Sequence, residues 1–150
     1  LIEASGPRKH CEMDFFGGEP LMNMKTVKAV TEYVRQREKE TGKKFKLTLT
    51  TNGILLNDEN IKWLNDNEFS LVLSLDGRKE VHDAMRPCVG GQGSYDKAVA
   101  NFHKCLDSRK GRDEIISVAQ NEADQIMGYI PTSVAPIPRI IWILPRMYCP

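Results

Sequence analysis

The sequence predicts an α/β protein built on a parallel sheet. Three short apolar runs are typical of strands: 11–16 (CEMDFF), 46–51 (KLTLTT) and 70–75 (SLVLSL). Segments with a helical period lie between and after these runs, which gives the order β-α-β-α-β-α. Strands that alternate with helices are joined by right-handed crossovers and run parallel. We expect each strand to be apolar on both faces, as in a buried parallel sheet.

The first helix is predicted over residues 24–40. Its apolar residues recur every three or four positions and form one core-facing stripe: Met24, Val27, Val30 and Val34. Asn23 suits the N-cap and Gly42 suits the end of the helix. The opposite face carries Lys, Arg and Glu, which is typical of a solvated surface.

Two further helices follow the second and third strands. Asn57 can cap a short helix that buries Ile61 and Leu64, and we expect Trp63 on this helix to pack rather than stack on a ligand. Ser94 can cap the third helix. Its inward-facing residues are predicted to be Tyr95, Ala98, Val99, Phe102 and Leu106.

Composition and charge limit the classes of function. The 150 residues are 41% hydrophobic and 27% charged, which is ordinary for one globular domain. A net charge of +1 points to neither a nucleic acid nor a membrane surface as a partner. The four cysteines are scattered without a metal-binding spacing. We interpret them as reduced thiols in a cytoplasmic protein.

A polar, glycine-bearing turn follows each predicted strand. These turns are GGEP (17–20), NG (52–53) and DG (76–77). The carboxyl ends of parallel strands share one edge of the sheet, where ligands bind. Turn formation alone explains NG and DG. By contrast, a carboxylate such as Glu19, held among glycines and a proline, is an acceptor suited to a cation.

Three motifs resemble those of a known family: DFFGGEPLMN, LTTNGILL, and LSLDGRKEVHDAMRP with the later GGQGSYDKAV. They are similar to radical S-adenosylmethionine (SAM) enzymes of the SPASM type. Within that group they most resemble the maturases that install thioether cross-links in six-cysteine (SCIFF) peptides. The resemblance runs from about Ser5 to about Arg109. It implies that residues 1–110 form βα units 2–4 of a partial (β/α)6 TIM barrel.

The resemblance also implies cofactors, a partner and a location. The intact enzyme would use SAM and a 4Fe-4S cluster to act on a cysteine-rich ribosomal precursor peptide in the cytoplasm. Gly17, Gly18, Glu19 and Pro20 would receive the ammonium group of SAM.

Three further positions match the family's SAM contacts. Ser74 and Arg86 resemble the pair that contacts the ribose and the carboxylate of SAM, and Asn52 would be a further contact. A guanidinium suits a carboxylate because its fork binds both oxygens. Asp76 would organise the loop or face the substrate. His82 and Asp83 are expected to order the loop that carries Arg86 rather than to act as a general acid.

The cysteines that hold a radical SAM cluster are missing from this sequence. The family places them in a CxxxCxxC loop upstream of GGEP, and these 150 residues contain no such motif. We therefore expect a fragment that cannot cleave SAM by itself. The alternatives are a sulfatase-maturating relative, which oxidises a Cys or Ser, and a non-catalytic remnant. An in-frame CxxxCxxC encoded upstream of Leu1 would favour an active parent enzyme.

Residues 111–150 are predicted to form an aberrant or poorly ordered tail. The stretch SVAPIPRIIWILPRMYCP is rich in proline and has no clear period. Reading two bases later from Thr132, permitted codons can give KRGTYTQNNLDFAEDVLP, which resembles the next strand and helix of the family. We predict a frame change between about Gly111 and Thr132. The nucleotide sequence tests this, and codons incompatible with the shifted reading would contradict it.

Overall fold

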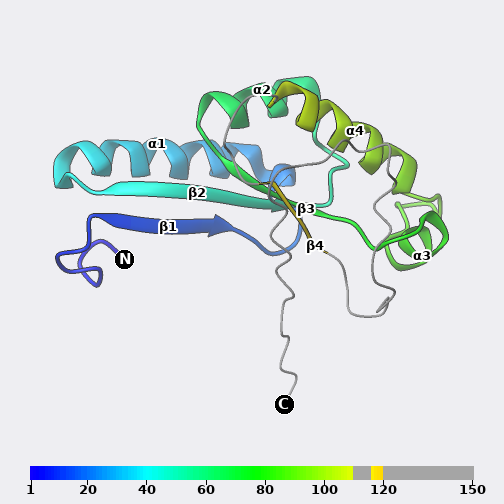
Figure 1. The fold of residues 1–150 in the computed structure, drawn as a ribbon, viewed down its shortest axis with the longest axis horizontal. Helices are drawn as coiled ribbons and strands as arrows, with labels where there is room; N and C mark the ends of the chain where they lie inside the picture. Colours follow the sequence, from blue (N-terminus) through cyan, green and yellow to red (C-terminus); the bar gives the residue numbers. More distant parts are fainter. Residues whose placement is uncertain (110–115, 120–150) are drawn as a thin grey trace, which may run out of the picture.

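One parallel sheet organises the chain in the computed structural model, which describes residues 1–109 and 116–119 (Figure 1). The sheet order is β1-β2-β3-β4, with β1 at His10–Phe15, β2 at Lys44–Thr51, β3 at Ser70–Ser74 and β4 at Ile116–Ala119. The helices are η1 (Pro20–Asn23), α1 (Met24–Thr41), α2 (Asp58–Asp66), α3 (Lys79–Met85) and α4 (Tyr95–Ser108). The predicted fold class, an α/β protein of consecutive βα units with parallel strands, is confirmed.

The ends of the first two predicted helices lie where the sequence placed them. The side chain of Asn23 caps α1 by accepting a hydrogen bond from Thr26 N at 3.3 Å. Gly42 ends α1 at a φ of 69°, in the left-handed region that favours glycine. Asn57 caps α2 by accepting from Asn60 N at 2.8 Å. These short-range signals act within a few residues, so the sequence alone reveals them.

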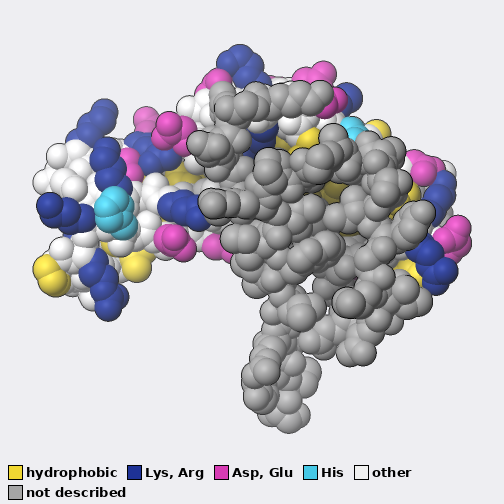
Figure 2. Space-filling view, viewed as in Figure 1, with side chains coloured by type: hydrophobic (Ala, Val, Ile, Leu, Met, Phe, Trp, Pro, Cys, Tyr) yellow, Lys and Arg dark blue, Asp and Glu magenta, His cyan; other side chains and the backbone are white. Residues whose placement is uncertain are grey.

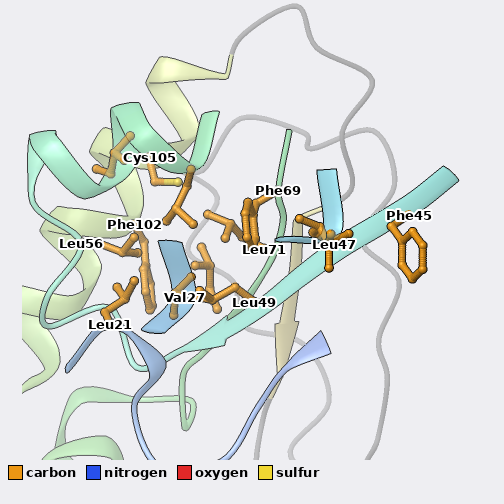
Figure 3. Close-up of a cluster of buried hydrophobic side chains, with 14 of the residues drawn as sticks. Leu21, Val27, Phe45, Leu47, Leu49, Leu56, Phe69, Leu71, Phe102 and Cys105 are labelled. Atoms are coloured by element: carbon orange, nitrogen blue, oxygen red, sulfur yellow. The ribbon is translucent and has the colours of Figure 1, made fainter. Parts of the chain in front are cut away.

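The hydrophobic core lies between the sheet and the helices, which cover one side of the strands (Figures 1 and 3). Four leucines of β2 and β3 are 0–1% exposed: Leu47, Leu49, Leu71 and Leu73. Trp63 packs against this core, with its ring centroid 5.6 Å from that of Phe69, as predicted. His10 and His103 are exposed.

The expectation of strands that are apolar on both faces is wrong. Exposure alternates along β1 and along most of β2, so that Phe45 and Leu47 are buried while Lys46 is exposed and Thr48 is half-buried. On the polar face, Glu12 stands beside Lys46 in the register of the sheet. The helices lie on one side of the strands, and only the side chains that point to that side are fully buried.

Part of the predicted tail belongs to the sheet. β4 pairs in parallel with β3, with Ile116 opposite Leu71, inside the range expected to be irregular. Four residues are too few to show the alternating pattern of a strand in the sequence. Residues 116–119 form one because that edge of β3 has no other partner among the described residues. The frame change between about Gly111 and Thr132 stays a prediction. Residues 110–115 and 120–150, to which the rest of that expectation applies, lie outside the described residues.

The structure also contains elements that the sequence did not reveal. The 3-10 helix η1 begins directly at Pro20, and α3 lies between the third turn and α4. Both are too short to show a helical period. No helix in the described residues combines the length and apolar character needed to cross a membrane.

We predict that Gly53→Ala destabilises the fold through a clash with α4. Gly53 has a φ of +81°, and an added Cβ would lie 2.2 Å from Cε1 of Phe102. Backbone strain and overpacking together should lower the free energy of unfolding by about 2–4 kcal/mol. Urea denaturation followed by circular dichroism measures the change.

Gly90→Ala is the matched control. Gly90 also has a positive φ, +100°, but an added Cβ would meet nothing within 4 Å. Backbone strain alone should cost about 1–2 kcal/mol there. Equal losses in the two variants would contradict the proposed contact between the second turn and α4.

Candidate functional site

The carboxylate of Glu19 joins the turns that follow β1 and β2. Its Oε2 accepts a hydrogen bond from Asn52 N at 2.8 Å. Its Oε1 accepts from Thr51 Oγ1 at 2.8 Å and from Leu21 N at 3.1 Å. A carboxylate has about four acceptor positions. Glu19 thus fastens the two turns to each other and keeps about one acceptor position, on Oε2, for a further donor.

The two glycines before Glu19 present their backbone to open space. Gly17 and Gly18 have φ values of 92° and 58°, and an added Cβ would meet nothing within 4 Å at either position. Within the described residues, no hydrogen bond ends on their carbonyl oxygens. Pro20 begins η1 directly after Glu19 and needs no backbone donor there. Carbonyl oxygens beside a carboxylate are suited to an ammonium group.

The second turn is held by its own side chain and by α4. Asn52 Oδ1 accepts a hydrogen bond from Ile54 N at 3.0 Å, which closes a local turn. Asn101 of α4 donates from Nδ2 to the Gly53 carbonyl at 2.8 Å. The backbone amide of Asn52 is already bound to Glu19, so the side-chain amide nitrogen is the part of Asn52 left for a ligand.

The third turn pairs Asp76 with Arg86. Asp76 is 3% exposed, and its carboxylate accepts from Arg86 Nε at 2.5 Å and from Arg86 Nη2 at 3.2 Å. The predicted loop-organising role of Asp76 is consistent with this ion pair. Ser74, at the end of β3, is half-buried, and its hydroxyl makes no hydrogen bond to the described residues.

His82 packs behind this ion pair in its neutral form. It is 1% exposed, and its Nδ1 accepts a hydrogen bond from Asp76 N at 3.2 Å. An acceptor nitrogen carries no proton, so the ring is the neutral tautomer with its proton on Nε2. Burial lowers the pKa of His82, and the Arg86 charge adds to this, while Asp76 and Asp83 oppose it. This contact is consistent with the predicted loop-ordering role of His82.

The predicted side-chain cap by Ser94 is wrong. Ser94 precedes α4 but donates its hydroxyl to the Arg86 carbonyl at 2.5 Å. Asp83 instead receives the first amide of α4, from Tyr95 N at 2.8 Å. Both side chains therefore fix the segment between α3 and α4 that carries Arg86. The Asp83 contact is consistent with its predicted loop-ordering role. The sequence missed the Ser94 contact, because it depends on how α3 packs beside α4.

The described cysteines do not fit an iron–sulfur cluster. Cys11 and Cys105 are buried on β1 and α4, Cys88 lies in the loop after Arg86, and all three are free thiols. The described residues contain no group of three or more His, Cys, Asp or Glu side chains that could hold a metal ion. A cluster would need ligands from beyond these residues.

A hollow of about 590 Å³ lies at the other end of the strands. Its lining includes His10, Glu12 and Lys44, and Figure 2 shows Lys and Arg side chains gathered over this end of the molecule. Arg35 and Glu38 in its wall bind each other and the backbone of Phe45. These contacts give the wall a structural role, so we place the candidate site at the edge with the three turns.

Comparisons with known proteins show which family the chain resembles. A family model described as a 4Fe-4S single cluster domain matches residues 1–100. The chain is similar to a cysteine-type anaerobic sulfatase-maturating enzyme of Clostridium novyi (strain NT), at 29% identity over 118 residues. It is also similar to one of Clostridium perfringens (strain ATCC 13124), at 35% identity over 98 residues. The matches cover 78% and 65% of this chain but only 31% and 25% of those enzymes.

Solved structures of a similar enzyme also match this chain. The chain is similar to native anSMEcpe with bound AdoMet, and to native anSMEcpe with bound AdoMet and Kp18Cys peptide. Each match has 26% identity and a TM-score of 0.66, and covers 77% of this chain and 30% or 31% of the other. The parallel βα units therefore match part of a TIM-barrel-like fold of the radical SAM type.

The fold defines an α/β protein with the Glu19 carboxylate at the first turn and an arginine held by Asp76 at the third. The chain belongs to the 4Fe-4S single cluster domain family and, with its relatives, to the radical SAM enzymes. The cofactors of this family are SAM, also called AdoMet, and a 4Fe-4S cluster. The comparisons bear out the radical SAM assignment and leave the thioether specificity a prediction.

We predict that His82 makes stability depend on pH. The unfolded chain binds a proton near the ordinary His pKa of 6.5, whereas the folded chain resists protonation at His82. Stability from this residue is therefore complete above pH 6.5 and is lost progressively as the pH falls below that value. Urea denaturation between pH 7.5 and pH 5 measures the slope.

The His82→Asn variant should show a flatter pH profile. His103→Asn is the control, because His103 is exposed on α4 and should leave the slope unchanged. An unaltered slope in His82→Asn would contradict a buried neutral His82.

Proposed function

We propose that the intact protein is a radical SAM enzyme of the sulfatase-maturating type, which oxidises a cysteine side chain of a peptide. The observation that carries this proposal is the convergence of the Glu19 loop, the Asn52 turn and Arg86 at one edge of the sheet. The printed names of the relatives support the choice of reaction, because they are cysteine-type anaerobic sulfatase-maturating enzymes. One relative also binds a Cys-containing peptide together with AdoMet.

The residues of this chain would hold SAM by its polar groups. The carbonyls of Gly17 and Gly18 and the remaining Oε2 acceptor of Glu19 would accept from the ammonium group. Arg86 would bind the carboxylate through the N–H groups that Asp76 leaves unused. Ser74 Oγ and Asn52 Nδ2 are polar groups suited to the ribose hydroxyls. When bound and reduced, SAM supplies a radical that removes a hydrogen atom from the substrate.

The chain by itself would bind SAM but not cleave it. The described residues offer no ligand set for the cluster that supplies the electron. In the intact protein these ligands would come from other parts of the polypeptide. The free thiols of Cys11, Cys88 and Cys105 agree with the cytoplasm as the location.

A thioether-forming maturase is the second candidate. The motifs DFFGGEPLMN and VLSLDGRKEVHD favour it, since they resemble the SCIFF maturases in particular. Its substrate would be a cysteine-rich ribosomal precursor peptide. Both candidates use the same SAM-binding edge and differ in the fate of the substrate cysteine.

SAM affinity tests the proposed binding site. Glu19→Ala and Arg86→Ala in the intact protein should each weaken SAM binding about tenfold, because each removes a charged hydrogen-bonding partner. Isothermal titration calorimetry under anaerobic conditions measures the affinity. Glu12→Ala is the control, since Glu12 is an exposed carboxylate within β1 rather than in one of the three turns. Unchanged affinity in both site variants would refute the assignment.

The product separates the two candidate reactions. With a cysteine-containing peptide, the sulfatase-maturating reaction should oxidise one residue and leave the peptide uncrosslinked. A thioether joins two positions, so protease digestion would release a covalently linked pair of fragments. Mass spectrometry of the digest distinguishes these results. A linked pair would favour the thioether maturase and overturn the first candidate.

A further inference from the structure

The ion pair of Asp76 and Arg86 leaves one edge of the guanidinium free. Arg86 uses Nε and Nη2 to bind the two carboxylate oxygens of Asp76. A guanidinium has five N–H groups, and this side-on contact occupies two of them. Of the three unused groups, one on Nη1 and one on Nη2 form the end-on edge. Within the described residues, Nη1 has no hydrogen-bond or ion-pair partner, and the Arg86 side chain is 31% exposed.

Arg86 is held at its backbone as well as at its side chain. Its amide donates to the His82 carbonyl at 2.8 Å, and its carbonyl accepts from Ser94 Oγ at 2.5 Å. His82 in turn accepts from the backbone amide of Asp76. These contacts connect the end of β3, α3 and the start of α4, so the direction of the guanidinium depends on the surrounding fold.

Asp76 is placed to set that direction. Its side chain is 3% exposed, whereas that of Arg86 is 31% exposed, so the carboxylate lies deeper in the protein than the arginine that it binds. A long arginine side chain loses considerable conformational freedom when it binds a ligand. A buried carboxylate that already holds two of its N–H groups reduces that loss.

We propose that Asp76 is a positioning residue, which binds one edge of Arg86 and aims the other at the carboxylate of SAM. This proposal rests on the proposed function, because it assigns a second residue to the same SAM site. Asp76 acts through Arg86 and does not itself touch the ligand. Arg86 therefore bridges two carboxylates, one from the protein and one from the cofactor.

The experiment compares two ligands in the intact protein. SAM and 5′-methylthioadenosine share the adenosine and the sulfur, but only SAM carries the carboxylate. Asp76→Asn should weaken SAM binding about tenfold, because one charged partner of Arg86 is lost, and should leave 5′-methylthioadenosine binding unchanged. Equal losses for both ligands would indicate a merely structural role and would overturn the proposal, as would unchanged SAM binding.

Asp96→Asn is the matched control. Asp96 of α4 forms an ion pair with Lys79 of α3, so it joins the same two helices without touching Arg86. This variant should bind both ligands as the unsubstituted protein does. A loss of SAM affinity as large as that in Asp76→Asn would show that the loosened helices, not Arg86, cause the effect, and would overturn the proposal.

The Arg86→Lys variant tests whether Arg86 binds the carboxylates of Asp76 and SAM together, even if Asp76→Asn folds poorly. A lysine ammonium is a point charge and cannot present two flat edges to two carboxylates. We expect about tenfold weaker SAM binding with 5′-methylthioadenosine unaffected. If the Arg86→Lys variant binds SAM as tightly as the unsubstituted protein does, the proposal that Arg86 uses one edge for Asp76 and the other for SAM is overturned.

A double variant separates this proposal from the site assignment. Adding Asp76→Asn to Arg86→Ala should cause no further loss of SAM affinity, because Asp76 acts only through Arg86. Additive losses would overturn the positioning role while leaving the SAM site in place. If Arg86→Ala alone leaves SAM affinity unchanged, both the proposed SAM site and this inference fail.

Discussion

The parallel direction of β1, β2 and β3 is the constraint on which the candidate site depends. Because these strands run the same way, their three following turns open at one edge of the sheet. The buried leucines of β2 and β3 hold the strands beneath the helices and so fix where the turns stand. Glu19 then decides how two turns face each other, since its carboxylate binds Thr51 and Asn52 directly.

Glu19 and Arg86 are both bound to the protein before any ligand arrives. Glu19 accepts three hydrogen bonds, and Arg86 gives one edge of its guanidinium to Asp76. What remains is about one carboxylate acceptor position at the first turn and one guanidinium edge at the third. These are the two positions that the proposed function assigns to the ammonium and carboxylate groups of SAM. Prior fixation also reduces the entropy that binding would otherwise cost.

The sequence predicted those features that arise from short stretches of chain. Caps at Asn23 and Asn57 and the left-handed Gly42 depend on contacts within one helical turn. The cap at Ser94 failed because its hydroxyl bonds to Arg86, a partner brought near by the packing of α3. The alternation in KFKLTLT of β2 was readable as one polar face, but a parallel sheet was expected to be buried on both sides.

By itself the sequence determined the α/β class, the three main strands and the gathering of GGEP, Asn52 and Asp76 at one edge. These follow from local periodicity and from the common direction of parallel strands. Only the tertiary structure decided which atoms of Glu19 are used, that Asp76 grips Arg86, and that β4 joins the sheet. Hydrogen bonds between separate turns depend on distances of a few ångströms, and the packing of helices against strands sets those distances.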